Sequence, residues 1–235
     1  MSVIIFDIEC KKSEILLLNE CQINSFPAEI CDFINLKKID LNYNQLSSLP
    51  AAIGNLINLK ELYLAHNLLS SLPVAIGNLI NLEVLCLHNN LLSTLPSTIS
   101  NLINLEELFL SNNQLSTFPT EICDLINLKK LNLNNNQLSS LPSTICNLIN
   151  LEELCLWYNQ LSTLPAEIIL IINNLLLNET SYTINNLDIE CPILIFSELN
   201  SNISNLPIKL NEIWLSKRIK KYDIKLPFNC KINFF

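Results

Sequence analysis

The chain has 235 residues and a formal net charge of −8, and its 49 Leu, 32 Ile and 35 Asn make up about half of it. Its two glycines exclude collagen-like and flexible-linker chains, which depend on Gly. A hydrophobic fraction of 49% excludes a chain kept disordered by charge. No run reaches the roughly 18 to 20 apolar residues of a membrane-spanning helix, so we expect no transmembrane segment.

The N-terminus does not resemble a secretory signal peptide. Its apolar stretch, Val3 to Phe6, is followed at once by Asp7 and Glu9, and no basic residue precedes it. Nine cysteines in a chain without such a signal favour reduced thiols inside a cell, and an odd number cannot all pair. We therefore expect a cytoplasmic protein, or one in the host cytoplasm if the source is a virus or an intracellular pathogen.

A period of 23 residues dominates the chain after its first 11 residues. One copy, residues 58–80, reads NLKELYLAHNLLSSLPVAIGNLI, and six copies run without insertion or deletion from Asn35 to Ile172. A seventh, weaker copy precedes them from residue 12. After residue 172 the phase is lost, although Leu-Pro pairs reappear. Such a period indicates stacked structural repeats that share one core.

Each copy is expected to contribute one strand and one outer turn. In Leu62-Tyr63-Leu64 the apolar residues alternate with a variable one, which is strand spacing. A strand this short cannot bury its inner face alone, so we expect the copies to stack side by side as a parallel sheet. A proline recurs in every copy, and we predict it at the first position of a short helical or 3₁₀ turn. These prolines are Pro27, Pro50, Pro73, Pro96, Pro119, Pro142 and Pro165.

An asparagine recurs just past each predicted strand, where the turn leaves backbone groups unpaired. A buried Asn offers an acceptor and a donor, so we predict a structural column that satisfies those groups. Its members are Asn44, Asn67, Asn90, Asn113, Asn136 and Asn159.

These columns resemble the leucine-rich repeat family, with its pattern L-x-x-L-x-L-x-x-N-x-L-x-x-L-P-x-x-I-x-x-L. The 23-residue period and the Leu-Pro-x-x-Ile segment are similar to the intracellular Ras-group subclass. The resemblance implies an α/β solenoid, a horseshoe with a parallel β-sheet on the concave face and short helical or 3₁₀ turns on the convex face. We expect an N-terminal cap (1–11), seven repeats (12–172), and degenerate repeats with a basic C-terminal cap (173–235). A small separate domain is the alternative for 173–235.

Residues between the core leucines are expected to line the concave face, where they vary from copy to copy. Exposed aromatics are enriched in binding hot spots, which favours Phe109 and Trp157 as contact residues. The alternative is that a large aromatic only shields the core atoms of its neighbours. The predicted partner-binding residues are Asp40, Tyr63, His66, Cys86, His88, Phe109, Asn132, Cys155, Trp157 and Tyr158.

The same predicted surface carries candidate zinc ligands and a candidate nucleophile. His66, Cys86 and His88 give three candidate zinc ligands at best, without the C-x-x-C spacing of zinc sites, so we expect no metal and no cofactor. A nucleophilic cysteine needs a base and an orienting group. Cys86 with His88 is the nearby pair, and it lacks a recognisable oxyanion site. We expect no enzymatic activity.

The function predicted from these observations is a non-catalytic protein-interaction module or scaffold. The resemblance implies a role in signalling, with a small GTPase as one partner class. Nucleic acid is disfavoured, because residues outside the basic segment 206–235 carry 20 acidic and 7 basic side chains. The alternatives are a host-directed effector, a substrate-recognition subunit of a ubiquitin ligase, and a structural spacer or oligomer. The sequence leaves the oligomeric state open.

Overall fold

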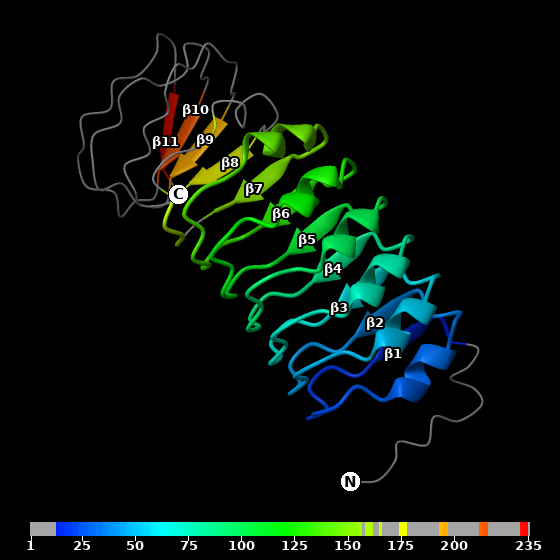
Figure 1. Ribbon diagram of the computed structural model, residues 1–235. Coiled ribbons are helices and arrows are strands. Elements are labelled where there is room, and N and C mark those ends of the chain that lie inside the picture. The colour runs from blue at the N-terminus through cyan, green and yellow to red at the C-terminus, as the bar shows by residue number, and fades with distance from the viewer. Residues whose placement is uncertain are drawn as a thin grey trace.

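The computed structural model describes residues 13–156, 158–161 and 165, together with the backbone of four later strands. The described chain forms an elongated stack of repeats (Figure 1). We number the repeats from 1 (residues 12–34) to 7 (residues 150–172), so that each 23-residue copy has one number. Strands lie along one side of the stack and short helical turns along the other (Figure 1).

The strands form an 11-stranded parallel sheet in which the order follows the sequence. From β1 to β7 each residue pairs with the residue 23 positions later, as in Leu62 with Leu85. The parallel sheet expected from the repeat is thus confirmed. The strands are β1 (Ile15–Leu17), β2 (Lys38–Asp40), β3 (Glu61–Tyr63), β4 (Val84–Cys86), β5 (Glu107–Phe109), β6 (Lys130–Asn132), β7 (Glu153–Cys155), β8 (Asn174–Leu177), β9 (Ile193–Phe196), β10 (Glu212–Leu215) and β11 (Lys231–Phe234).

Six 3₁₀ turns are described on the other side of the stack, and they confirm the outer turns predicted from the sequence. The proline precedes each turn as its N-cap instead of occupying the first position. Its carbonyl accepts the first hydrogen bond of the turn, as from Ile53 N to Pro50 O at 3.1 Å. The turns are η2 (Ala28–Asp32), η3 (Ala51–Asn55), η4 (Val74–Asn78), η5 (Ser97–Asn101), η6 (Thr120–Asp124) and η7 (Ser143–Asn147).

The core is a continuous stack of Leu and Ile between the sheet and the 3₁₀ turns. In each of the strands β2 to β7 the middle residue, such as Leu62 or Leu108, is at most 1% exposed, while its neighbours are more accessible. Ile53 and Ile76 from the turns complete the same cluster. Burying one such side chain contributes roughly 1.5–3 kcal/mol relative to leaving it exposed. Each repeat obtains that burial mainly from its neighbours, which explains why the copies stack.

The asparagine that follows each strand bonds the backbone of two repeats. Asn113 is buried, and its Nδ2 donates to the carbonyls of Leu87 and Leu110, both at 3.0 Å. Its Oδ1 accepts from the N–H of Leu92 at 2.9 Å. The equivalent bonds recur at each member of the column, so we call this set the inner Asn ladder. It satisfies backbone groups that the turn buries without another partner.

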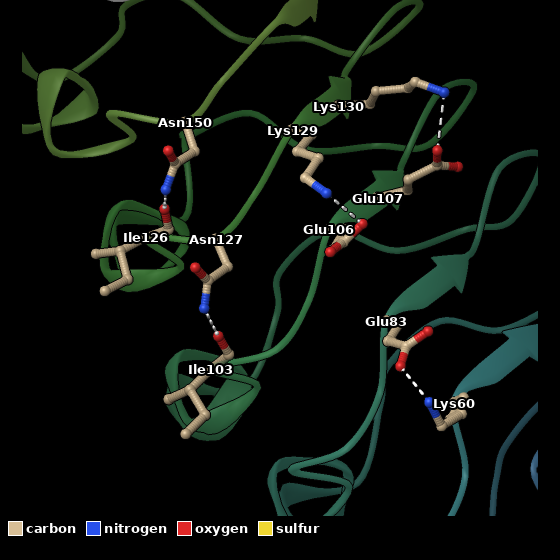
Figure 2. A network of polar contacts seen from close by, with 10 residues as sticks. All are labelled: Lys60, Glu83, Ile103, Glu106, Glu107, Ile126, Asn127, Lys129, Lys130 and Asn150. Atoms are coloured by element: carbon tan, nitrogen blue, oxygen red, sulfur yellow. Dashed lines mark hydrogen bonds and ion pairs between the residues drawn. The ribbon is translucent and has the colours of Figure 1, made fainter.

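A second set of asparagines, which the sequence analysis did not assign, bonds on the exposed edge. Asn127 Nδ2 donates to the carbonyl of Ile103 at 2.7 Å, and Asn150 Nδ2 donates to that of Ile126 at 2.8 Å (Figure 2). In the same way, Asn58, Asn81 and Asn104 donate to the carbonyls of Ile34, Ile57 and Ile80, respectively. This outer Asn ladder joins the chain just after each 3₁₀ turn to the start of the second strand that follows it.

An Asn→Ala substitution is predicted to lower the free energy of unfolding more in the inner ladder than in the outer ladder. Asn113→Ala leaves the buried N–H of Leu92 without its partner and removes one of the two amide bonds at each of the carbonyls of Leu87 and Leu110, so we expect a loss of about 1–3 kcal/mol in the free energy of unfolding. Asn104→Ala removes one exposed bond, which water replaces, so we expect a loss below about 1 kcal/mol. Urea denaturation of both variants beside the wild type measures the difference. Equal losses would contradict the structural role assigned to burial of the inner ladder.

Candidate functional site

The accessible face of the sheet carries the residues on either side of each buried strand leucine. In β3, for example, Glu61 and Tyr63 lie on this face while Leu62 points into the core. Because adjacent strands pair in register, equivalent residues form columns across the repeats. The partner-binding residues predicted in the described chain therefore occupy one continuous surface.

An aromatic patch lies on repeats 2 to 5 of this surface. The rings of Tyr43 and His66 stack with centroids 4.1 Å apart and an interplanar angle of 12°. His88 meets His66 edge-on, with centroids 5.3 Å apart. Tyr63 and Phe109 flank Cys86 on the neighbouring strands. We call Tyr43, Tyr63, His66, His88 and Phe109 the aromatic patch.

Hydrogen bonds hold the two histidines of the patch in place. His66 Nε2 lies 3.1 Å from Asn89 Nδ2, and His88 Nδ1 lies 3.0 Å from Cys86 Sγ. Burial, followed by the neighbouring His66, lowers the pKa of His88 below its ordinary value. The orientations of the Tyr43, His66 and His88 rings are therefore set by contacts within the protein.

The contact between Cys86 and His88 has the geometry of a nucleophile and its base, but its electrostatics favour the neutral pair. Burial raises the pKa of the Cys86 thiol to about 11, and the negative charge of Asp40 adds to this, against a smaller opposing effect of a hydrogen bond with the backbone of His88. The lowered pKa of His88 likewise opposes an imidazolium. A thiolate is the reactive species of cysteine, so this pair is a poor nucleophile at neutral pH.

Two predicted contact residues offer little surface to a partner. Cys86 and Cys155 are buried, and Cys155 Sγ donates to Glu153 Oε1 at 3.2 Å. Burial also raises the pKa of the Cys155 thiol. Both residues therefore occupy sheet-face positions but expose too little surface to contribute much to a contact. Within the described residues, no group of three or more His, Cys, Asp or Glu side chains could hold a metal ion.

The remaining predicted residues lie at the ends of the strands. Asp40 Oδ1 accepts from the backbone N–H of Asn42 at 3.0 Å, and Asn132 Oδ1 accepts from that of Asn134 at 3.1 Å. These bonds tighten the turn that follows each strand. Tyr158 is exposed on repeat 7. Trp157 lies outside the described residues.

Ion pairs cross the sheet face between adjacent repeats. Lys38 Nζ donates to Glu61 Oε2 at 2.7 Å and lies 4.7 Å from the centre of the Tyr63 ring, whose hydroxyl donates to the same Glu61 oxygen at 2.9 Å. The bond from Lys38 holds the pKa of Glu61 below its ordinary value, although burial opposes it. The other pairs are Lys37–Glu14, Lys60–Glu83, Lys129–Glu106 and Lys130–Glu107, at 2.6 to 2.8 Å. Exposed pairs of this kind contribute about 0–1 kcal/mol each.

Within the described residues, no ion pair joins repeats 4 and 5, nor repeats 6 and 7. Glu83 pairs backward with Lys60, and Glu106 pairs forward with Lys129, so these carboxylates of repeats 4 and 5 bond to opposite neighbours (Figure 2). A groove of about 390 Å³ lies here, lined by these two glutamates, Lys60 and three asparagines of the outer ladder. The two adjacent glutamates make this junction acidic.

A column of left-handed backbone runs along the end of the strands. Asn89, Asn112 and Asn135 have φ between 50° and 55°, a region that Asn tolerates well. Tyr43 and Tyr158 occupy the same column with φ of 56° and 53°, although bulky side chains rarely adopt it. His66 and Tyr158 of this column were predicted from the sequence as contact residues, but their left-handed backbone was not. Non-glycine residues held there cost of order 1–3 kcal/mol and often mark functional sites.

The two family models that match this chain describe the same kind of repeat. The model "Leucine-rich repeat region" matches residues 8–118, and the model "Leucine Rich repeats (2 copies)" matches residues 126–167. Together they cover more than half of the chain, which belongs to the leucine-rich repeat family. Comparison with curated protein sequences finds no match.

Solved structures agree on the fold. A leucine-rich repeat protein of Leptospira interrogans is 30% identical, with a TM-score of 0.62, and 89% of this chain aligns with 63% of that one. Internalin C2 of Listeria monocytogenes is also 30% identical, with a TM-score of 0.55 and 60% of each chain covered. The functional domain of InlJ from the same organism is 17% identical, with a TM-score of 0.68, and 89% of this chain covers 46% of it. The chain thus spans less than two-thirds of each.

The horseshoe architecture expected from the sequence is confirmed by these neighbours and by the sheet and turns described above. Within the part of the chain that the structure describes, no helix is long and apolar enough to cross a membrane. Proteins of this family generally mediate protein–protein interaction.

The left-handed column predicts a reciprocal pair of stability changes. Tyr158→Asn places a residue that tolerates this conformation at an exposed position, so we expect a gain of about 0.5–1 kcal/mol in the free energy of unfolding. Asn135→Tyr introduces the bulky residue at the equivalent position one repeat earlier, and we expect a similar loss. Denaturant titration of both variants measures the pair. Changes of the same sign would show that backbone conformation does not govern this column.

The lowered pKa of His88 predicts a pH dependence of stability. The unfolded chain binds a proton near the ordinary value of 6.5, whereas folded His88 binds it only at lower pH, so the unfolded state gains protons first. Stability therefore falls as the pH drops below 6.5. We expect urea midpoints to decrease between pH 7.5 and 5.5 in the wild type and to decrease less in His88→Asn. Asn already occupies this column at Asn134, and identical pH profiles would exclude His88 as the source.

Proposed function

We propose that this chain is a non-catalytic protein-interaction module whose partner binds on the concave sheet face across repeats 2 to 5. The observation that carries the proposal is the aromatic patch, in which stacking and hydrogen bonds orient the rings of Tyr43, His66 and His88 before any partner binds. Tyr, and aromatic residues generally, are enriched at binding interfaces. A rigid surface also loses less entropy on association than a mobile one.

The surroundings of the patch favour a protein over a small ligand. The patch extends over four repeats and is bordered by the ion pairs Lys38–Glu61 and Lys60–Glu83, so polar groups surround an aromatic centre. This arrangement matches the apolar core and polar rim of protein interfaces. The acidic junction at Glu83 and Glu106 lies at the start of the strands, whereas His66 and His88 follow their ends, and it favours basic side chains on the part of the partner that reaches it.

The finer assignment rests on the pattern of the repeat. The 23-residue period and the Leu-Pro-x-x-Ile segment support an intracellular scaffold in signalling, with a small GTPase as one partner class. The neutral Cys86–His88 pair supports binding without catalysis. We accordingly propose a cytoplasmic location, in the host cytoplasm if the source is a virus or an intracellular pathogen.

The proposal predicts that the partner is lost when the patch is cut back. The tagged full chain captures its partner from a lysate, and the double variant Tyr43→Asn/Phe109→Ala should bind it at least about tenfold more weakly, because each aromatic anchor contributes on the order of 1 kcal/mol or more. Asn suits the left-handed backbone at residue 43, so the fold should be retained.

The matched control is Val74→Ala, which removes an apolar side chain of η4 that is 67% exposed on the opposite side of the repeat. It should bind as the wild type does. Equal capture by the double variant would place the contact surface elsewhere, and equal loss in Val74→Ala would assign it to the convex side.

A further inference from the structure

One isoleucine in each of repeats 1 to 6 lies on the surface at the end of its repeat. These six residues expose 48% to 69% of their surface although the chain has ample core positions for aliphatic side chains. They follow one another every 23 residues, so they form a single row along one edge of the stack. We call Ile34, Ile57, Ile80, Ile103, Ile126 and Ile149 the isoleucine ridge.

Each isoleucine of the ridge has at least one backbone hydrogen bond, and Ile103 and Ile126 are bonded at both the N–H and the carbonyl. The carbonyl of Ile103 accepts from Asn127 Nδ2 at 2.7 Å, and its N–H donates to the carbonyl of Asn101 at 2.8 Å. Ile126 has the same two partners, Asn150 and Asp124. The side chains of both isoleucines point away from the ribbon (Figure 2). An apolar row whose backbone is held by such hydrogen bonds is preorganised for contact.

The borders of the ridge consist mostly of Asn side chains, and three asparagines of the outer ladder share a groove with Lys60, Glu83 and Glu106. The outer Asn ladder runs along one side, and on the other side the last residues of the 3₁₀ turns are Asn except at Asp32 and Asp124. Carboxamides both donate and accept hydrogen bonds, so a border of Asn is complementary to itself. Between residues 13 and 161 the chain carries 13 acidic and 5 basic side chains, which disfavours an anionic lipid surface as the occupant.

We propose that the isoleucine ridge is the contact surface between two copies of this chain, packed antiparallel about a two-fold axis between Ile80 and Ile103. Both copies have the same spacing between repeats, about 4.8 Å at the strands. Antiparallel packing about this axis therefore places the isoleucines of repeats 1, 2 and 3 opposite those of repeats 6, 5 and 4 in the second copy. A two-fold contact is self-complementary and closes, as most homodimers do. This inference is independent of the sheet-face partner proposed above.

The register of this dimer follows from the charges. With the axis between Ile80 and Ile103, Asp32 faces the partner's Asn147, and Asp124 faces the partner's Asn55, so no carboxylate of the border meets another. The ridge and its two Asn-rich borders comprise seventeen exposed residues, near the roughly 20 residues a side of the smaller stable interfaces. Charge and extent therefore both favour a second copy as the occupant.

Sedimentation equilibrium of the full chain tests the dimer and its register. The wild type should sediment as a monomer–dimer equilibrium, and Ile80→Glu/Ile103→Glu should raise the dimer dissociation constant at least about a hundredfold, since four like charges would meet near the axis. Ile80→Glu/Ile103→Lys pairs opposite charges across the same axis. It should recover most of the lost association.

The control is Leu68→Asp/Leu91→Asp, which adds two charges at exposed leucines outside the ridge. It should dimerise as the wild type does, and circular dichroism of all variants checks folding. A wild type that remains monomeric at every concentration would overturn the proposal, as would equal effects of the Glu/Glu and Glu/Lys pairs. The sheet-face variant Tyr43→Asn/Phe109→Ala should leave the dimer unchanged, which separates this test from that of the proposed function.

Discussion

Each buried asparagine of the inner ladder binds carbonyl groups of its own repeat and of the preceding one, and the stack depends on this amide. The short strands turn sharply, and the turns bury backbone groups that no strand or helix can satisfy. The leucine core supplies most of the apolar burial, but hydrophobic packing is not directional. The hydrogen bonds of the amide have a required geometry, so they fix the register of the next repeat. The register of the whole sheet, and hence every column on its face, follows from that requirement.

Two surfaces with different chemistry result from one repeat. The sheet face changes from copy to copy, because nothing in the core or the ladder restricts the side chains of Tyr63, Cys86 or Phe109 beyond their position. The edge after each 3₁₀ turn stays constant, with an exposed isoleucine in each of repeats 1 to 6. Variation suits recognition of a distinct partner, and constancy suits contact with an identical surface. The stack therefore separates two kinds of contact on one rigid support.

The sequence was sufficient for the fold because core positions recur with a fixed period. The Leu and Pro columns predicted a parallel sheet with outer turns, and the structure differs only in placing each proline one residue before its turn. Pairwise contacts were harder to predict. The stack of Tyr43 on His66 depends on the left-handed backbone at both residues, which is visible in the sequence only as Asn at the equivalent residues 89, 112 and 135. The exposure of Ile103 was missed because an isoleucine beside a buried leucine looks like core until the turn is known.

The separations within the ladders also govern how such a chain can change length. The inner amide of Asn90 reaches back 26 residues to Leu64 and 21 residues to Leu69, and the outer amide of Asn104 reaches back 24 to Ile80. Duplication or excision of any 23 consecutive residues keeps each of these separations for the amides that remain. A change of any other size breaks every bond that crosses it. Arrays of this kind can thus grow or shrink by whole units, and each new unit arrives with its hydrogen bonds already specified while its sheet-face side chains are free to diverge.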